Sequence, residues 1–311
     1  MSENSTNVRS TQVSGVRRLA GWIDRWFGPD RAAWLAQRLF FRARRQRRPM
    51  RESVWLTEAI RFRVDGERPV VAWRWGDLDR PVVLLVHGWE GRGAQLGAFV
   101  APLLAKGFQV VAYDAPAHGE SPGRESTIPE AAEALIRVAR QVGPLAGIVA
   151  HSFGAAATTL ALSKGLRAAR VVYVAPMVEV NATVERFSDF LALSPAARAA
   201  FLARVETRAG ASMASIEGVR LSRALRAPLL AIHDEDDREI PIADAEKLVA
   251  AWPGARLVRT RSLGHRRILR EAPRVAQAAD FLAESLRVLP LAATIDRELF
   301  DPDLRRAALT A

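Results

Sequence analysis

The sequence predicts an α/β fold in which a mostly parallel sheet is covered by helices on both faces. Short apolar runs alternate with amphipathic helical stretches from about residue 58 to residue 288, and this alternation is typical of right-handed βαβ units. Several runs are continuously apolar, as expected for strands buried on both faces. Each of the five histidines ends or follows a predicted strand: they are His87, His118, His151, His233 and His265.

Length and composition exclude several classes of protein. The 311 residues suggest one large domain with insertions, or at most two domains, and an apolar content of 49% suffices for a sizeable core. The sequence contains no cysteine, which excludes disulfides, cysteine nucleophiles and thiolate metal sites. No apolar run reaches the roughly 18 residues of a transmembrane helix, and the polar N-terminus lacks a signal-peptide core. We therefore expect a cytoplasmic protein.

Positive charge is concentrated at the beginning of the chain. The first 51 residues hold 12 Arg against Glu3, Asp24 and Asp30, a net charge of +9, whereas the remaining 260 residues have a net charge of +2. The body of the protein is therefore nearly neutral, and no nucleic-acid partner is expected for it. Residues 1–15 are polar and are expected to be disordered.

Residues 1–50 form a basic N-terminal arm, of which residues 16–48 are amphipathic. Apolar residues recur there at helical spacing in two segments separated by Gly28-Pro29. Tryptophan beside arginine favours a helix lying on an anionic membrane surface. The alternative is that the apolar stripe docks on the main domain while the arginines are solvated. Binding of nucleic acid or of a partner protein by the arm is a third interpretation.

The remaining elements are expected in the following order. Two strands at residues 58–64 and 70–75 are joined by a hairpin turn at 65–68. Further strands are expected at 81–86, 108–113, 147–150, 169–175, 228–232 and 256–260. Helices are expected near 95–106, 129–141 and 243–251, after the strand at 147–150, and after His265 as far as about 288. Short helices at 177–226 interrupt the alternation, and 289–311 is a tail without an assigned structure.

Ser152 stands at a tight turn between a strand and a helix. The small residues Ala150 and Gly154 on either side of it allow the strand and the helix to pack closely, and the new helix N-terminus favours negative charge beside the hydroxyl. This arrangement is the G-x-S-x-G nucleophile elbow with alanine replacing the first glycine. The other interpretation is an ordinary helix N-cap serine.

Two further side chains complete a pattern of nucleophilic catalysis. Ser152, Asp237 and His265 occur in this order, each after its own strand. A serine nucleophile needs a base within hydrogen-bond reach, histidine titrates near neutrality, and a buried carboxylate orients the imidazole. Because four acidic residues stand in a row at this point, Asp236 is an alternative acid, although the register against the following Ile-Pro favours Asp237.

These motifs resemble those of the α/β-hydrolase superfamily over roughly residues 58–288. His87-Gly88-Trp89 is similar to the family's turn after its third strand, and residues 114–121 resemble its Asp-x-x-Gly-x-Gly-x-Ser loop. Residues 237–241 and Gly264-His265 resemble its acid and histidine loops. The resemblance implies an α/β-hydrolase fold with its core at 51–176 and 227–288 and a helical cap insertion at 177–226.

The resemblance also implies a role for each site residue. Ser152 attacks an acyl carbonyl, His265 takes its proton, and Asp237 orients His265. The backbone N–H groups of Trp89 and Phe153 are implied to form the oxyanion hole. Apolar residues of the cap insertion are expected to line the acyl pocket. The pocket residues that we expect are His87, Gly88, His151, Phe187, Phe190 and Phe201.

The sequence thus predicts a serine hydrolase that cleaves a carboxylic ester or related acyl bond of a small molecule through an acyl-enzyme intermediate. An acyl thioesterase and a peripheral-membrane lipid esterase are alternatives within the class. A non-catalytic binding protein on a hydrolase scaffold is an alternative outside it. Neither a cofactor nor a metal is expected, because the sequence has no dinucleotide loop, P-loop or H-E-x-x-H spacing. The oligomeric state is not predicted.

Overall fold

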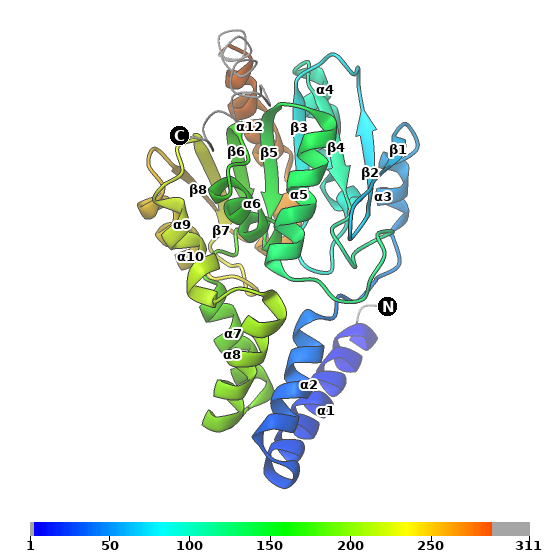
Figure 1. Ribbon diagram of the computed structural model, residues 1–311. Coiled ribbons are helices and arrows are strands. Elements are labelled where there is room, and N and C mark those ends of the chain that lie inside the picture. Colours follow the sequence, from blue (N-terminus) through cyan, green and yellow to red (C-terminus); the bar gives the residue numbers. More distant parts are fainter. Residues whose placement is uncertain (1–2, 288–311) are drawn as a thin grey trace.

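The computed structural model describes residues 3–287 and has a layered α/β architecture (Figure 1). Its sheet has the strand order β1-β2-β4-β3-β5-β6-β7-β8. The strands are β1 (Ile60–Val64), β2 (Val70–Trp75), β3 (Val82–Val86), β4 (Gln109–Tyr113), β5 (Leu145–His151), β6 (Ala168–Val174), β7 (Leu229–Asp234) and β8 (Arg256–Thr260). Only β2 runs antiparallel to its neighbours β1 and β4. The predicted fold class is confirmed.

Helices cover both faces of this sheet and extend beyond one end of it. The helices are α1 (Glu3–Phe27), α2 (Pro29–Phe41), α3 (Met50–Trp55), α4 (Val100–Ala105), α5 (Ile128–Val142), α6 (Phe153–Ser163), α7 (Val180–Leu191), α8 (Pro195–Ala209), α9 (Gly218–Ser222), α10 (Ile242–Ala251), α11 (Gly264–Arg267) and α12 (Ala272–Ala283). The 3-10 helices are η1 (Gly93–Phe99), η2 (Met213–Ile216), η3 (Ile268–Arg270) and η4 (Glu284–Arg287).

Alternate residues of the central strands face opposite helical layers. In β3, Leu84 belongs to the core that includes α5 and α6, whereas Leu85 belongs to the core that includes α4 and α12. Both side chains are fully buried. A strand covered on both faces must be apolar at every position, which is why residues 82–86 show no polar alternation.

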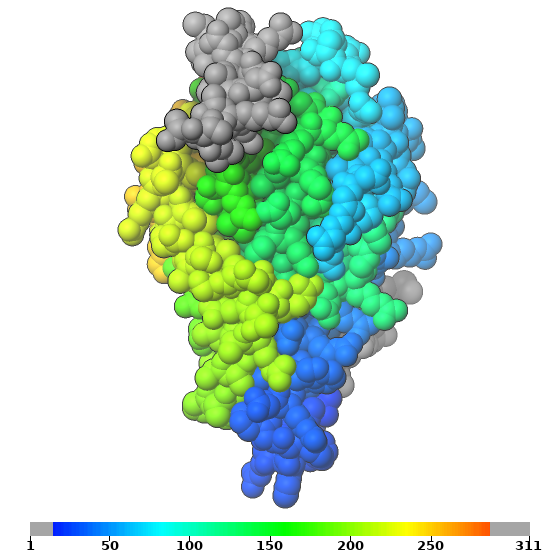
Figure 2. All heavy atoms as spheres, in the orientation of Figure 1, coloured from blue at the N-terminus to red at the C-terminus, as the bar shows by residue number. Residues whose placement is uncertain are grey.

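The N-terminal arm and the cap insertion lie side by side beyond the carboxyl ends of the parallel strands (Figures 1 and 2). Helix α2 of the arm packs against α8 of the insertion. The small residues Ala32, Ala33 and Ala36 of α2 are fully buried, which allows the helices to approach closely. The arm therefore docks on the cap insertion.

Several local expectations differ from the structure. Helix α1 begins at Glu3, where a disordered segment was expected over residues 1–15; the segment contains no proline and continues directly into the amphipathic turns that follow. Helix α3 was not predicted, and the single helix expected at 95–106 consists of η1 followed by α4. The tail at 289–311 lies outside the described residues. No described helix is long and apolar enough to cross a bilayer.

Candidate active site

Ser152 occupies a strained backbone position between β5 and α6. Its φ of 52° and ψ of −120° are unfavourable for a residue with a Cβ atom. Its N–H donates to Val174 O at 3.1 Å, and its carbonyl accepts from Ala155 N at 2.9 Å and from Met177 N at 3.3 Å. These backbone hydrogen bonds therefore hold Ser152 in its strained conformation. Ser152 stands at the N-cap position, but its side chain makes no capping hydrogen bond, so the ordinary N-cap interpretation does not explain it.

Two glycines allow the β3 loop to approach this turn. A Cβ atom at Gly154 would lie 2.7 Å from Val86 O and 2.6 Å from His87 O. A Cβ atom at Gly88 would lie 3.0 Å from Ser152 Cβ. Since these neighbours are backbone atoms or the elbow itself, a larger residue at either position would push the loop away from the serine.

Asp237 and His265 are in direct contact. His265 Nδ1 donates to Asp237 Oδ2 at 2.7 Å, and the N–H groups of Glu239 and Ile240 donate to Asp237 Oδ1 at 2.8 and 3.0 Å. Burial disfavours the charged carboxylate, but hydrogen bonds from His233 and His265 hold the pKa of Asp237 well below its ordinary value. The carboxylate therefore stays ionised beside the imidazole.

Asp236 makes different contacts. Its Oδ2 accepts from Ser262 N at 2.8 Å, and its N–H donates to Asp234 Oδ1 at 3.1 Å. Asp236 is exposed, whereas the Asp237 side chain is fully buried. Of the two acids that the sequence left open, Asp237 is the one that contacts His265.

His87 and His118 fix loops beneath the site. His87 Nε2 accepts from Ala115 N at 2.9 Å, and its Nδ1 donates to Gly88 O at 2.7 Å. His118 Nδ1 donates to Pro116 O at 2.9 Å. Burial lowers the pKa of His87 to about 3 and that of His118 to about 4. Both side chains are therefore neutral at physiological pH and hold the backbone around them.

His151 and His233 contact the loops that hold His265 and Asp237. His151 Nε2 donates to His265 O at 3.0 Å, and burial lowers the pKa of His151 to about 3. Its ring centroid lies 4.6 Å from that of His265. His233 Nε2 donates to Ile240 O at 3.0 Å and lies 3.5 Å from Asp237 Oδ2. These contacts position His265 from one side and Asp237 from the other.

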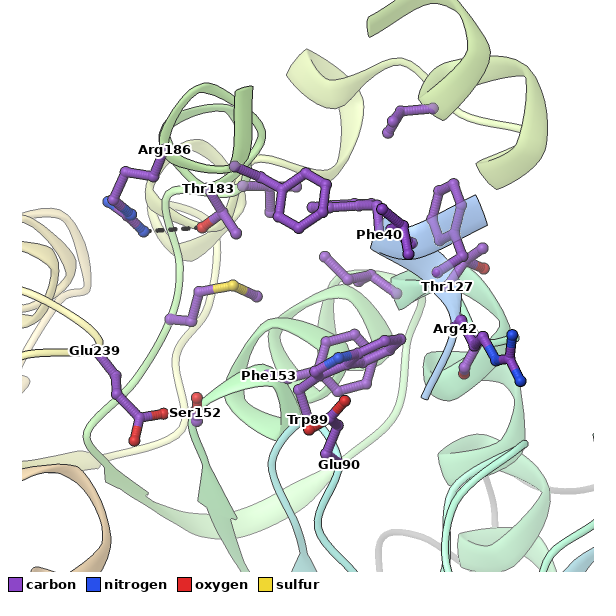
Figure 3. A pocket seen from close by; sticks show the side chains of 18 of the residues that line it. Phe40, Arg42, Trp89, Glu90, Thr127, Ser152, Phe153, Thr183, Arg186 and Glu239 are labelled. Atoms are coloured by element: carbon purple, nitrogen blue, oxygen red, sulfur yellow. Dashed lines mark hydrogen bonds between the residues drawn. The ribbon is translucent and has the colours of Figure 1, made fainter. Parts of the chain in front are cut away.

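A cavity of about 930 Å³ opens above Ser152 and His265. Trp89 and Phe153, whose backbone N–H groups are the predicted oxyanion donors, also line it, and their rings meet edge to face at 5.2 Å. Phe153 is the first residue of α6, where unpaired N–H groups and the helix dipole favour negative charge. Figure 3 shows Ser152 and Trp89 at the floor and Phe40 across the cavity from them.

The cavity wall differs in part from the expected one. Phe187 and Phe190 line it as expected, but Phe201 is fully buried behind it, 5.6 Å from Phe40 between ring centroids. The expected pocket residues His87, Gly88 and His151 are not part of the lining, because they pack in the loops below and make backbone contacts there.

Sequence reasoning missed the contribution of the N-terminal arm to this wall. The arm supplies Val16, Leu39, Phe40, Phe41, Arg42, Arg44, Arg45 and Gln46. The consecutive phenylalanines at the end of an amphipathic helix were the available signal. Their partners in the cap insertion could not be recognised from the sequence, because the two segments are far apart in the chain.

Charged side chains lie at both ends of the cavity. Figure 3 shows Glu239 at one end and Arg42 at the other. Glu239 Oε2 lies 3.9 Å from His265 Nε2, and Glu239 Oε1 lies 3.2 Å from Arg266 Nε. The end near Arg42 also has the exposed residue Arg44. Between these ends the lining is mostly apolar, which is suited to an acyl chain.

The chain belongs to the alpha/beta hydrolase family, because residues 83–279 match the sequence model of that family. The predicted superfamily is confirmed, and with it the class of hydrolases. The pimeloyl-[acyl-carrier protein] methyl ester esterase of Aromatoleum aromaticum is 28% identical over 234 residues, which are 60% of this chain and 92% of that protein.

Solved structures share the fold at low sequence identity. The 2-hydroxy-6-oxo-6-phenylhexa-2,4-dienoate hydrolase of Rhodococcus sp. strain RHA1 is 20% identical, with a TM-score of 0.56 over 74% of this chain and 99% of that one. An esterase of Pyrococcus furiosus is 17% identical, with a TM-score of 0.59 over 79% of this chain and 98% of that one.

Proposed function

We propose that this protein is a serine hydrolase that cleaves a carboxylic ester through an acyl-enzyme intermediate on Ser152. The observation that carries the proposal is the 2.7 Å hydrogen bond between His265 and Asp237, with His265 lining the same cavity as the strained Ser152. The relative from Aromatoleum aromaticum, whose name states a methyl ester as its substrate, supports an ester as the cleaved bond.

The first half of the reaction forms the acyl-enzyme. Ser152 Oγ attacks the carbonyl carbon while His265 Nε2 takes the hydroxyl proton, and the ionised Asp237 stabilises the resulting imidazolium. The carbonyl oxygen becomes an oxyanion that accepts from the N–H groups of Phe153 and Trp89. Each such donor contributes about 2.7–4 kcal/mol of transition-state stabilisation in related chemistry. His265 then gives its proton to the departing alcohol.

The second half releases the acid. A water molecule enters the position of the alcohol and gives a proton to His265 Nε2 as its oxygen attacks the acyl carbon. The same oxyanion donors stabilise the second tetrahedral intermediate. When it collapses, the bond to Ser152 Oγ breaks and the oxygen recovers its proton from His265. Asp237 remains ionised throughout.

The shape of the cavity supports an apolar acyl chain as the substrate group. Phe40, Phe187 and Phe190 face the space above Ser152 and offer contact area without hydrogen-bonding groups. Helix α2 adds Leu39, Phe40 and Phe41 to this wall. We therefore propose a medium-length acyl ester of a small alcohol as the preferred substrate.

An acyl thioesterase is the second candidate function, and one observation favours it. Arg42 and Arg44 line the cavity, Arg42 at the end opposite Glu239 (Figure 3), and guanidinium groups pair well with phosphates such as those of a coenzyme thioester. Comparison of kcat/KM for an acyl-coenzyme A and for the p-nitrophenyl ester of the same acid separates the two candidates. A thioesterase would prefer the former and would lose that preference in an Arg42→Gln/Arg44→Gln variant.

Hydrolysis of p-nitrophenyl esters from acetate to palmitate, by the wild type and by Ser152→Ala in parallel, tests the proposed function. Turnover that depends on Ser152 supports the nucleophile, and the preferred chain length measures the pocket. Full activity in Ser152→Ala would overturn the proposal.

A fluorophosphonate probe distinguishes the enzyme from a non-catalytic binding protein on the same scaffold. Labelling of Ser152 in a protein that hydrolyses none of these esters would mean an activated nucleophile with a more specialised substrate. Absence of both labelling and hydrolysis would favour the binding protein.

A further inference from the structure

Helix α1 of the N-terminal arm has two apolar faces. Val16, Ala20 and Ile23 pack against the core. A second stripe, formed by Leu19, Trp22 and Trp26 at spacings of three and four residues, is 48%, 52% and 67% exposed. Large apolar side chains that lie together on a surface mark an interaction site more often than single ones do. We call these three residues the α1 stripe.

Two arginine side chains lie against aromatic rings at this end of the arm. The Arg25 guanidinium lies 6.0 Å from the ring centroid of Trp26, and that of Arg31 lies 5.4 Å from the ring of Phe27. Phe27 is 47% exposed and lies 5.0 Å from the ring of Trp22. Tryptophan rings prefer the boundary between lipid headgroups and acyl chains, and arginines there pair with lipid phosphates. The composition of the surface therefore matches a bilayer interface.

The charge of the arm determines the kind of surface that it can meet. The first 51 residues carry +9, and the rest of the chain carries +2. A second copy of the chain on the α1 stripe would bring two strongly cationic arms together, which like-charge repulsion opposes. An anionic bilayer has the complementary charge, so arginines near its surface strengthen binding.

The α1 stripe is connected to the cavity through the same arm. Asp24, also on α1, accepts from Ser194 N at 2.8 Å and from Ser194 Oγ at 3.1 Å, which fixes α1 to the cap insertion. Val16 of α1 and Phe40 of α2 line the cavity. A surface bound to the α1 stripe would therefore lie beside the cavity, at the end of the molecule beyond the sheet (Figure 1).

We propose that the α1 stripe binds the surface of an anionic phospholipid bilayer, with Trp22 and Trp26 inserted among the headgroups and Arg25 and Arg31 paired with lipid phosphates. This binding is independent of the reaction at Ser152. It would bring membrane-dissolved esters close to the cavity without any membrane-spanning segment.

Vesicle co-sedimentation of the full-length protein tests the proposal. The wild type is expected to bind vesicles of phosphatidylcholine with phosphatidylglycerol, to bind pure phosphatidylcholine weakly, and to dissociate as ionic strength rises. The Trp22→Ser/Trp26→Ser variant should bind at least about tenfold more weakly, because it loses two interfacial anchors. Arg25→Gln/Arg31→Gln should bind about tenfold more weakly as well. The matched control is Leu78→Ser, which alters a residue that is 69% exposed outside the arm and should leave binding unchanged.

Three outcomes would overturn the proposal. They are no binding by the wild type, equal binding by the tryptophan variant, and a wild-type dimer in sedimentation equilibrium that the tryptophan variant loses. Circular dichroism confirms that each variant is folded. Because binding is measured without turnover, and also with Ser152→Ala protein, failure of the proposed reaction does not affect this test.

Discussion

The ring of Phe40 in the N-terminal arm lies 5.2 Å from the ring of Phe187 in the cap insertion, at an interplanar angle of 65°. Both residues line the cavity above Ser152. The cavity is thus closed by two segments that are far apart in the sequence, and its size depends on how the arm docks on the insertion.

The Phe40→Ala variant should accept longer acyl chains than the wild type. Removing this ring enlarges the cavity and removes apolar contact with shorter chains, so kcat/KM for the best wild-type ester should fall several-fold while the optimum moves to longer esters. A chain-length series of p-nitrophenyl esters measures the shift. Trp34→Ala, an exposed residue on the same helix, should keep the wild-type profile. An unchanged profile in Phe40→Ala would mean that the Phe40 ring does not limit the space for the acyl chain.

Asp237→Asn should lower kcat by about 10⁴-fold, because an amide cannot hold the imidazole tautomer or stabilise the imidazolium. Asp236→Asn is the matched control. Its carboxylate accepts from Ser262 N rather than from His265, so its kcat should stay within a few-fold of the wild type. Equal losses in the two variants would mean that the 2.7 Å contact between Asp237 and His265 is not the functional one.

Glu239→Gln should change selectivity between neutral and anionic substrates. The Glu239 carboxylate lies 3.9 Å from His265 Nε2 and half of its side chain is exposed, so it opposes negative charge near the reacting atoms. One unit charge at this distance in water contributes about 1 kcal/mol. We expect kcat/KM to rise about fivefold for an ester with a free carboxylate and to stay nearly constant for a neutral ester of the same length. An equal change for both esters would contradict the electrostatic role.

Acidification should destabilise the fold well before the ordinary carboxylates titrate. Burial lowers the pKa of His87 and His151 to about 3 and that of His118 to about 4. The unfolded chain therefore binds these protons first, and the stabilisation from the neutral histidines is lost as pH falls from about 6.5 towards about 3. Asp114, whose pKa burial raises to about 6, acts in the opposite direction, but three histidine shifts outweigh it.

Thermal unfolding at several pH values measures this effect. The melting temperature should fall steadily below about pH 6.5. His118→Gln, which removes one of the three buried groups, should show a shallower fall. A melting temperature that stays constant or rises on acidification would contradict the assignment of these histidines as buried and neutral.

The turn at Ser152 and the loops that bring Asp237 and His265 together could be predicted because their signals are local. Ser152 needs small residues two positions away on each side, and Gly154 is required by the backbone oxygens of Val86 and His87. The strands were recognisable because burial on both faces demands continuous apolar runs. The choice between Asp236 and Asp237 was open, because it depends on which carboxylate the loop turns toward His265.

The arm and the pocket could not be predicted in the same way. The apolar stripe of α2 indicated that the helix packs somewhere, but it carried no information about α8 as its partner. Phe201 satisfied every local criterion for a pocket residue and is buried behind Phe40 instead. His151 was also expected in the pocket. Its Nε2 donates to His265 O instead, and the side chain lies below the cavity. Long-range docking decides these positions.

The most direct test of the central claim, that Ser152 is a nucleophile activated by His265 and Asp237, is covalent labelling of the full-length protein by a fluorophosphonate, with the modified residue located by peptide mass spectrometry. We predict a single adduct on Ser152, formed far more slowly in His265→Ala and absent in Ser152→Ala. Labelling at another serine, or equally fast labelling of Ser152 in His265→Ala, would contradict the account.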